Sequence, residues 1–151
     1  SFETWNAGVG ARLTWKSGWT VGGAFHATGS GANIRSPYGT WPGWLSLIEV
    51  DFDRANEKAA GLSVKYDFGK SRRLHAPGLK ALASYGRGVD REDPGTGASL
   101  ADTGEVDFAR TYDVPTVKGL QLRLRNAYVD SGGRETGYQI RFIVNWEVDL
   151  W

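Results

Sequence analysis

The sequence predicts an all-β chain whose antiparallel strands form part of the wall of a transmembrane β-barrel. The main observation is the segment 138–151, in which every even position is apolar or aromatic and the odd positions are polar apart from Ile143 and Trp151. Side chains alternate between the two faces of a strand, so this segment has one apolar and one polar face. Soluble strands usually sustain such alternation for about 4–8 residues. A tilted strand needs about 9–11 residues to cross an outer membrane.

The composition is the second observation. The chain has 151 residues with 21 Gly, 7 Trp, 6 Tyr and 6 Phe, which suits closely paired strands with aromatic side chains at the membrane interfaces. The mean hydropathy of -0.40 excludes a helical membrane protein, but it fits a barrel because half of each strand faces water. The net charge of +1 gives no general attraction for nucleic acid, so electrostatic specificity has to be local. The absence of cysteine is compatible with an oxidising envelope compartment.

Four strands are expected in the first part of the chain, at residues 4–15, 19–28, 57–68 and 79–87. In each of them, apolar or small residues alternate with polar residues or glycine. The outward positions are expected to be Trp5, Ala7, Val9, Ala11 and Leu13; Trp19, Val21, Gly23 and Phe25; Leu62, Val64, Tyr66 and Phe68; and Leu79, Ala81, Ala83 and Tyr85.

Three more strands are expected at residues 105–114, 120–130 and 138–151. Arg110 is an exception, since it occupies an outward position among apolar residues. The other outward positions are expected to be Val106, Phe108, Tyr112 and Val114; Leu120, Leu122, Leu124 and Tyr128; and the even positions of the last segment.

The connections alternate between short and long, which orients the wall. The links 16–18, 69–78 and 116–119 are expected at one end of the strands, and the longer polar links 29–56, 90–103 and 131–136 at the other. Short periplasmic turns and long extracellular loops are typical of outer-membrane barrels. Near the short links, an aromatic girdle at the membrane surface is expected. Its tryptophans are Trp15, Trp19, Trp146 and Trp151.

Seven strands do not close a bacterial single-chain barrel, which has an even number of at least eight. An open edge in lipid would leave backbone N–H and C=O groups unpaired. The chain also begins at Ser1 without an initiator Met, a basic segment or an apolar signal segment. We therefore expect residues 1–151 to be one region of a longer barrel.

Several motifs resemble a known family of channels. They are LRLRNA (122–127), IRFIV (140–144), PGWLSLI (42–48), DFDRANEKA (51–59), YDF (66–68), APGL (76–79) and YGRG (85–88). In order and spacing they resemble OprD-type outer-membrane porins, the substrate-specific channels of Gram-negative bacteria. The resemblance implies an eighteen-stranded barrel in the bacterial outer membrane, of which this chain would be the C-terminal fragment.

Three arginines are candidates for binding solutes. Arg123 and Arg125 lie two apart and share the inward face, and Arg141 lies inward on the next strand. Guanidinium groups bind carboxylates through a planar fork, and a series of them gives an anion successive weak sites. The resemblance also implies a basic ladder at these positions. The alternative is that these arginines pair with Glu147, Asp107 or Asp113 and only solvate a polar wall.

The connection 29–56 is the second candidate, because loops of this length are commonly functional or disordered. It contains too much apolar surface to extend into water, so folding into the pore is expected. The family resemblance implies that such a loop supplies acidic and hydroxyl groups to the constriction, here Tyr38, Ser46 and Asp51. The alternative is that its tryptophans pack on the rim or on a neighbouring subunit.

Enzymatic function is not expected. His26 and His75 are far apart and there is no cysteine, so neither a metal site nor another cofactor is predicted. The predicted function is the passive uptake of small carboxylate-bearing solutes such as amino acids, aromatic acids or other organic acids. The alternatives are a closed structural or adhesive outer-membrane barrel and a soluble β-sandwich.

The expected partners follow from that function. They are small anionic or zwitterionic solutes, outer-membrane lipid and lipopolysaccharide, and the barrel-assembly machinery. A homotrimer is compatible with the resemblance, because porins commonly associate.

Overall fold

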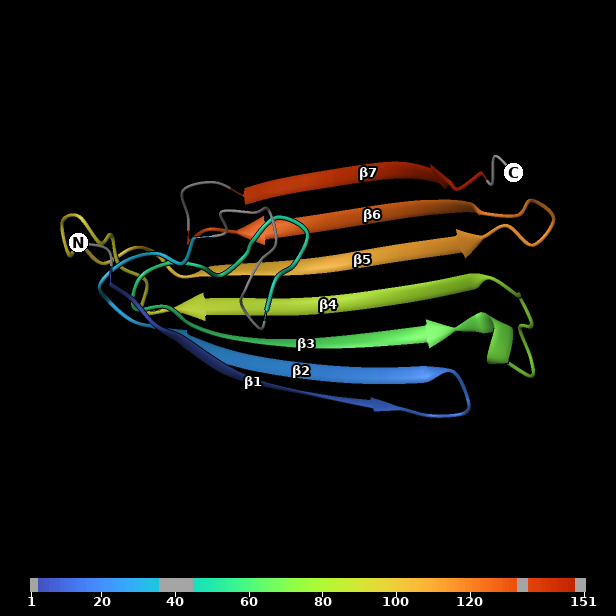
Figure 1. Cartoon of the computed structure of the whole chain (residues 1–151), viewed down its shortest axis with the longest axis horizontal. Helices are drawn as coiled ribbons and strands as arrows, with labels where there is room; N and C mark the ends of the chain where they lie inside the picture. Colours follow the sequence, from blue (N-terminus) through green and yellow to red (C-terminus); the bar gives the residue numbers. More distant parts are fainter. Residues whose placement is uncertain (1–2, 36–44, 133–135, 149–151) are drawn as a thin grey trace.

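One antiparallel sheet makes up the fold (Figure 1). The computed structural model describes residues 3–35, 45–132 and 136–148. Each strand pairs with the next one along the chain, in the order β1-β2-β3-β4-β5-β6-β7. The elements are β1 (Asn6–Thr14), β2 (Trp19–Thr28), β3 (Lys58–Asp67), the 3₁₀ turn η1 (Phe68–Lys70), β4 (Leu79–Val89), β5 (Thr103–Asp113), β6 (Leu120–Asp130) and β7 (Thr136–Trp146). The predicted all-β, antiparallel fold is confirmed.

The register places the predicted outward residues on a single face. Val9 lies opposite Phe25, Leu62 lies opposite Tyr85, and the pairing continues in phase through β7. The apolar side chains of this face are not covered by protein, and Leu62 and Phe142 are 65% and 68% exposed. A continuous exposed apolar face of this kind suits contact with lipid, because a soluble protein rarely exposes so large a patch.

The short links lie together at one end of the strands and the long ones at the other (Figure 1). Near the short links, the Tyr66 ring packs against a tilted Trp19 ring, at 4.5 Å between ring centroids, and makes an edge-to-face contact with Phe68, at 4.8 Å. These rings fit an interfacial aromatic belt. Trp151, which was also expected there, lies outside the described residues. Within the part of the chain that is described, no helix is long and apolar enough to cross a bilayer.

Arg110 keeps its outward position, as the alternation requires. It lies opposite Ala81 and Leu124, and its guanidinium carbon lies 4.9 Å from the centroid of the Phe108 ring. A cation over an aromatic face is attracted by the ring quadrupole. This contact gives the charge a partner on the apolar face.

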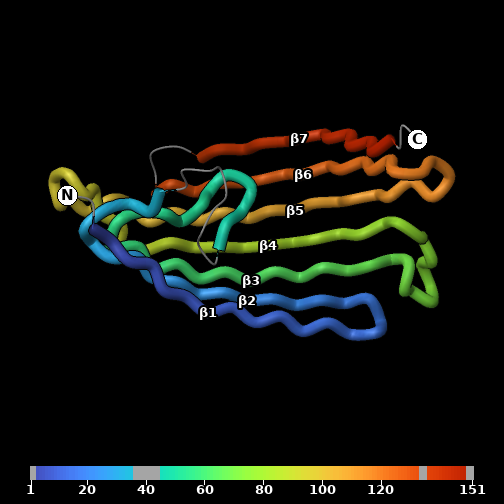
Figure 2. The backbone as a smooth tube through the Cα atoms, viewed as in Figure 1, coloured from blue at the N-terminus to red at the C-terminus, as the bar shows by residue number. Residues whose placement is uncertain are grey.

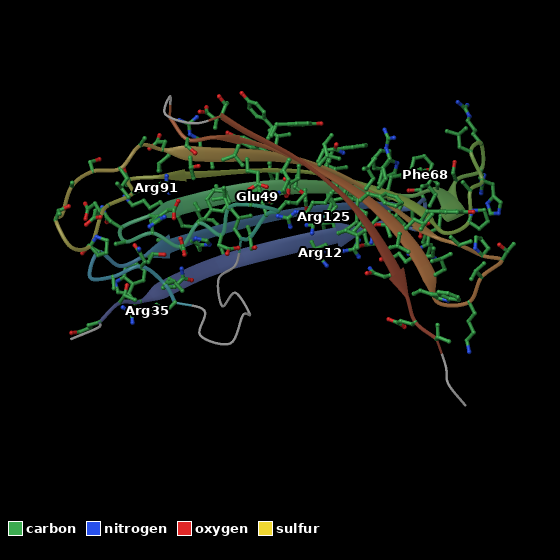
Figure 3. All side chains as sticks on the ribbon, turned by 90° about the horizontal axis from the view of Figure 1, so that it is seen from above. Arg12, Arg35, Glu49, Phe68, Arg91 and Arg125 are labelled. Atoms are coloured by element: carbon green, nitrogen blue, oxygen red, sulfur yellow. The ribbon has the colours of Figure 1, made fainter. Side chains whose placement is uncertain are left out.

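The sheet is curved (Figure 3), and residues 45–56 fold back over its inward face (Figure 2). Leu45 and Phe52 from this segment form a small buried core with Ala59 of β3, and Leu47 and Val50 pack against it. Glycine on the strands below permits the close approach. A Cβ atom at Gly86 would lie 2.8 Å from Phe52 Cζ, and one at Gly61 would lie 2.5 Å from Leu45 Cδ1. The inward position of this part of the loop therefore depends on small residues in β3 and β4.

Candidate functional site

The three predicted arginines lie on the inward face of neighbouring strands. Arg125 of β6 lies directly opposite Arg141 of β7, and Arg123 lies opposite Ile143 of the same strand. The Arg123 Nη2 atom donates to Gln121 Oε1 at 2.9 Å, whereas its buried Nε atom has no hydrogen-bond partner among the described residues. Arg125 makes no ion pair with another residue in the described part of the chain. The structure thus brings the three side chains into one patch.

The basic patch continues across the sheet through residues that lie opposite one another on successive strands. Starting from β3, the line that contains Arg125 runs through Lys65, Leu82, Ala109, Arg125 and Arg141. Strands in outer-membrane barrels tilt by about 35–45° from the barrel axis, so a line perpendicular to the strands rises along that axis. Basic side chains on one such line would lie at successive heights along the axis.

A hollow of about 780 Å³ lies over β1 to β4, and Lys65 of the line described above borders it. Two basic side chains, Arg12 and Lys65, line it together with the hydroxyl-bearing residues Ser63 and Ser84. Leu45, Ser46 and Leu47 of the folded-back segment form its other side. The hollow is therefore a space between the wall and the loop whose lining combines apolar residues with hydroxyl groups and two basic side chains.

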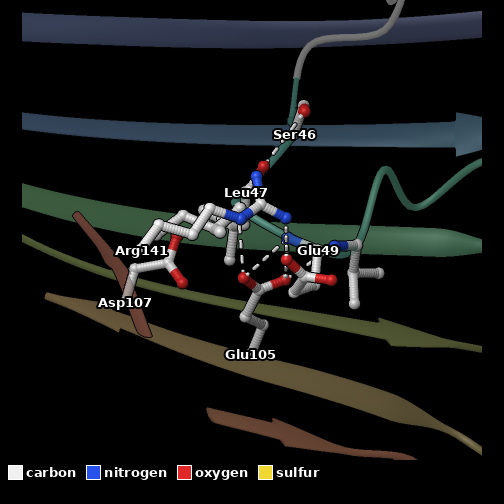
Figure 4. A network of polar contacts seen from close by, with 8 residues as sticks. Ser46, Leu47, Glu49, Glu105, Asp107 and Arg141 are labelled. Atoms are coloured by element: carbon white, nitrogen blue, oxygen red, sulfur yellow. Dashed lines mark hydrogen bonds and ion pairs between the residues drawn. The ribbon is translucent and has the colours of Figure 1, made fainter. Parts of the chain in front are cut away.

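Two carboxylates of β5 hold this segment (Figure 4). Glu105 accepts hydrogen bonds from the backbone N–H groups of Ile48 at 3.0 Å, Glu49 at 3.0 Å and Val50 at 2.7 Å. Asp107 Oδ2 accepts a second contact from the Ile48 N–H at 3.1 Å. Glu105 and Asp107 are 1% and 4% exposed, so both groups are removed from water. Carboxylate acceptors make stronger hydrogen bonds than neutral acceptors.

Glu49 and Arg141 form an ion pair between the loop and β7 (Figure 4). The two side chains remain partly exposed, at 31% and 40%. The alternative expected from the sequence named Glu147, Asp107 and Asp113 as partners for the arginines. Glu49 is the partner observed for Arg141. Asp113 pairs with Lys80 at 2.7 Å, and Asp107 attracts Arg125 at longer range without forming an ion pair with it.

The loop residues predicted for the constriction are only partly brought together. Ser46 Oγ donates to Asp51 Oδ1 at 2.6 Å, so these two residues bond to each other. Ser46 also borders the hollow. Tyr38 lies outside the described residues.

The base of the loop is anchored by buried polar groups near the ends of β2 and β3. His26 Nε2 lies 2.8 Å from the Phe52 carbonyl oxygen. The Glu57 carboxylate accepts from the Arg54 N–H at 2.8 Å and lies 3.3 Å from Arg91 Nε. Burial raises the pKa of the Glu57 carboxyl above its usual value, and the hydrogen bond and Arg91 only partly offset this effect.

Sequence reasoning did not single out Glu49, Glu105 or Lys65 as site residues. The alternation does place Glu105 and Asp107 on the inward face, where two carboxylates side by side are a detectable signal. Their partners are backbone N–H groups of the loop, which have no sequence signature. Within the described residues, no group of three or more His, Cys, Asp or Glu side chains is arranged to hold a metal ion.

Comparison with solved structures identifies the same fold in outer-membrane proteins of Pseudomonas aeruginosa. OccK9 (OpdG) is 24% identical with a TM-score of 0.81, and 95% of this chain covers 36% of that one. OccK3 (OpdO) is 22% identical with a TM-score of 0.83, over 98% of this chain and 40% of that one. OpdK, solved with vanillate, is 22% identical with a TM-score of 0.74, over 85% of this chain and 34% of that one. The chain thus spans well under half the length of these proteins.

A comparison with family models matches residues 42–150 to the OprD family of outer membrane porins. Among curated proteins, no significant match was found. The match covers most of the chain, and the solved structures share its antiparallel wall. The chain therefore belongs to the OprD family of porins of the bacterial outer membrane.

Proposed function

We propose that this chain forms part of the lumen wall of a channel for the passive uptake of small carboxylate-bearing solutes. The observation that carries the proposal is the inward patch of Arg123, Arg125 and Arg141, in which Arg125 and Arg141 are directly opposed. Guanidinium groups stay protonated and match the geometry of a carboxylate. The solutes proposed are amino acids and aromatic or other organic acids.

The comparisons support a channel at the level of the family. A related protein, OpdK, was solved with vanillate, an aromatic carboxylate. The hollow beside the loop offers Arg12 and Lys65 as further cations, together with hydroxyl groups. A wall that alternates cationic and hydroxyl side chains can replace part of the hydration shell of a solute without binding the solute tightly.

We further propose that residues 1–151 are the C-terminal region of an eighteen-stranded barrel. β1 and β7 are the two edge strands of the sheet and do not pair with each other. Unpaired backbone groups at a lipid-exposed edge cost several kcal/mol each, so further strands have to cover both edges. This geometry argues against the alternative of a small barrel closed by these seven strands.

The test is ion selectivity of the whole protein in a planar bilayer, read as the reversal potential under a salt gradient. The Arg123→Gln/Arg125→Gln double variant is expected to shift selectivity toward cations and to lower the flux of carboxylates. The matched control is Arg87→Gln/Arg110→Gln, which removes two positive charges from the outward face. An unchanged reversal potential in the inward variant would contradict the proposal.

A further inference from the structure

The loop supplies its own carboxylate to the basic patch. We propose that the Glu49 carboxylate occupies the anion-binding position on the Arg141 guanidinium group and that Glu105 holds Glu49 there. An anionic solute then binds Arg141 only by displacing Glu49. The inference deepens the proposed function and rests on it. It concerns the ion pair between Glu49 and Arg141 and the three hydrogen bonds that Glu105 accepts from the loop.

The first step is the attachment of the loop backbone. Three successive N–H groups, from Ile48 to Val50, point at one carboxylate, and the Ile48 N–H also reaches Asp107. Glu105 is almost fully buried, so these bonds form away from bulk water. Removing one partner of a buried, charged hydrogen bond is costly, because the other group is left without solvation. The position of this turn is therefore fixed relative to β5.

The second step is the direction of the Glu49 side chain. Its own N–H is bound by Glu105 of β5, while its carboxylate contacts Arg141 of β7, across the intervening strand β6 (Figure 4). A carboxylate tethered in this way acts as if it were present at a high local concentration. Glu49 thus occupies the site that a carboxylate of a solute would use.

The third step is the strength of the pair. Both side chains are partly exposed, and ion pairs in contact with water contribute little net stability. A solute carboxylate makes the same type of bond to a guanidinium group, so it can replace Glu49. Displacement also limits how tightly the solute is held, and transport requires that it leave the site again.

The experiment compares Glu49→Gln with the unaltered protein in planar bilayers, with benzoate as the probe. The variant is expected to shift the reversal potential toward anions, because Arg141 loses its internal counter-charge. The half-saturating benzoate concentration is expected to fall by about two- to fivefold, the range that a weak exposed ion pair implies. The control is Glu147→Gln, which removes one exposed negative charge at the end of β7.

Glu105→Gln tests the positioning role. It keeps the size of the side chain but removes the charge that binds the turn, so it is expected to lower the half-saturating benzoate concentration as Glu49→Gln does. In the double variant the two effects are not expected to add, because both act through the same ion pair. A residue with only a structural role would change conductance and leave the benzoate concentration unaltered. Heat-dependent migration on gels verifies that each variant is folded.

The outcomes separate this inference from the proposed function. One outcome is that Arg123→Gln/Arg125→Gln changes selectivity while Glu49→Gln changes neither selectivity nor the half-saturating benzoate concentration. In that case the occupation of Arg141 by Glu49 is disproved, and the proposed channel lined by arginines is retained. If neither variant changes selectivity, both are disproved. Additive effects of Glu49→Gln and Glu105→Gln on benzoate saturation would overturn the positioning role of Glu105.

Discussion

Arg125 and Arg141 occupy directly opposed positions on β6 and β7, with both side chains on the inward face. Like charges at opposed positions of an antiparallel pair are unfavourable, since the Cβ atoms lie about 4.5–5.5 Å apart. Glu49 forms an ion pair with Arg141, whereas Arg125 forms no ion pair among the described residues and has the buried Asp107 only as a more distant electrostatic partner. The wall therefore keeps an arginine without an ion pair beside one that is ion-paired.

Removing the compensated pair as a whole is expected to leave ion selectivity nearly unchanged. In Glu49→Gln/Arg141→Gln one charge of each sign disappears, so the net charge of the lumen stays the same. Arg125→Gln alone removes a positive charge that forms no ion pair with a described residue, and it is expected to shift the reversal potential toward cations. A shift of similar size in both variants, measured in planar bilayers, would contradict the difference between these two arginines.

Phe52→Ala is expected to release the folded-back segment from the wall. Phe52 is fully buried between this segment and the sheet, and its carbonyl oxygen lies 2.8 Å from His26 Nε2. Truncation of a buried Phe typically costs about 3–5 kcal/mol. The expected result is faster proteolysis within residues 45–56 and a noisier single-channel current. Leu74→Ala, at an exposed position of the 71–78 link, is the control and is expected to change neither.

Gly119→Ala is expected to destabilise the barrel more than Gly97→Ala. Both glycines have positive φ angles, +76° and +68°, which cost an L-residue about 1–2 kcal/mol. At Gly119 a Cβ atom would also collide with the Glu147 carbonyl oxygen, whereas at Gly97 it would meet nothing within 4 Å. The difference between the urea unfolding midpoints of the two variants in detergent therefore measures how much the collision lowers stability. Equal midpoints would show that the 116–119 turn can relax.

Glu57 is expected to make stability fall as the pH rises. Because burial raises its pKa in the folded state, the folded protein binds a proton that the unfolded chain has already released. The contribution of Glu57 is therefore complete below its usual value of 4.5 and is lost as the pH rises through the folded pKa. From pH 4 upward, the decrease of the urea unfolding midpoint that is due to Glu57 is expected to disappear in Glu57→Gln and to remain in Glu147→Gln. An unaltered pH profile in Glu57→Gln would refute the assignment.

The strand faces could be predicted from sequence because alternation depends on neighbouring residues alone. Val106 and Phe108 follow the period of two, and the register places them where the pattern requires. Even the exceptional Arg110 keeps its face. Lipid on one side and water on the other enforce this pattern along every strand.

The contacts of the loop could not be predicted in the same way. Glu49 and Arg141 are separated by 92 residues, and nothing in the local pattern joins them. Glu105 binds backbone N–H groups, which every residue other than proline carries. The glycines that admit Phe52 and Leu45 to the wall also appear as ordinary strand glycines until the loop is placed over them.

The most direct test of the central claim is liposome swelling with the whole protein at neutral pH, comparing benzoate with erythritol, an uncharged and strongly hydrophilic solute of similar mass that crosses lipid only slowly. The inward arginines predict faster entry of benzoate, with the preference lost in Arg123→Gln/Arg125→Gln and retained in Arg87→Gln/Arg110→Gln. Equal entry of the two solutes through the unaltered protein, or a benzoate preference that survives the loss of Arg123 and Arg125, would contradict the account.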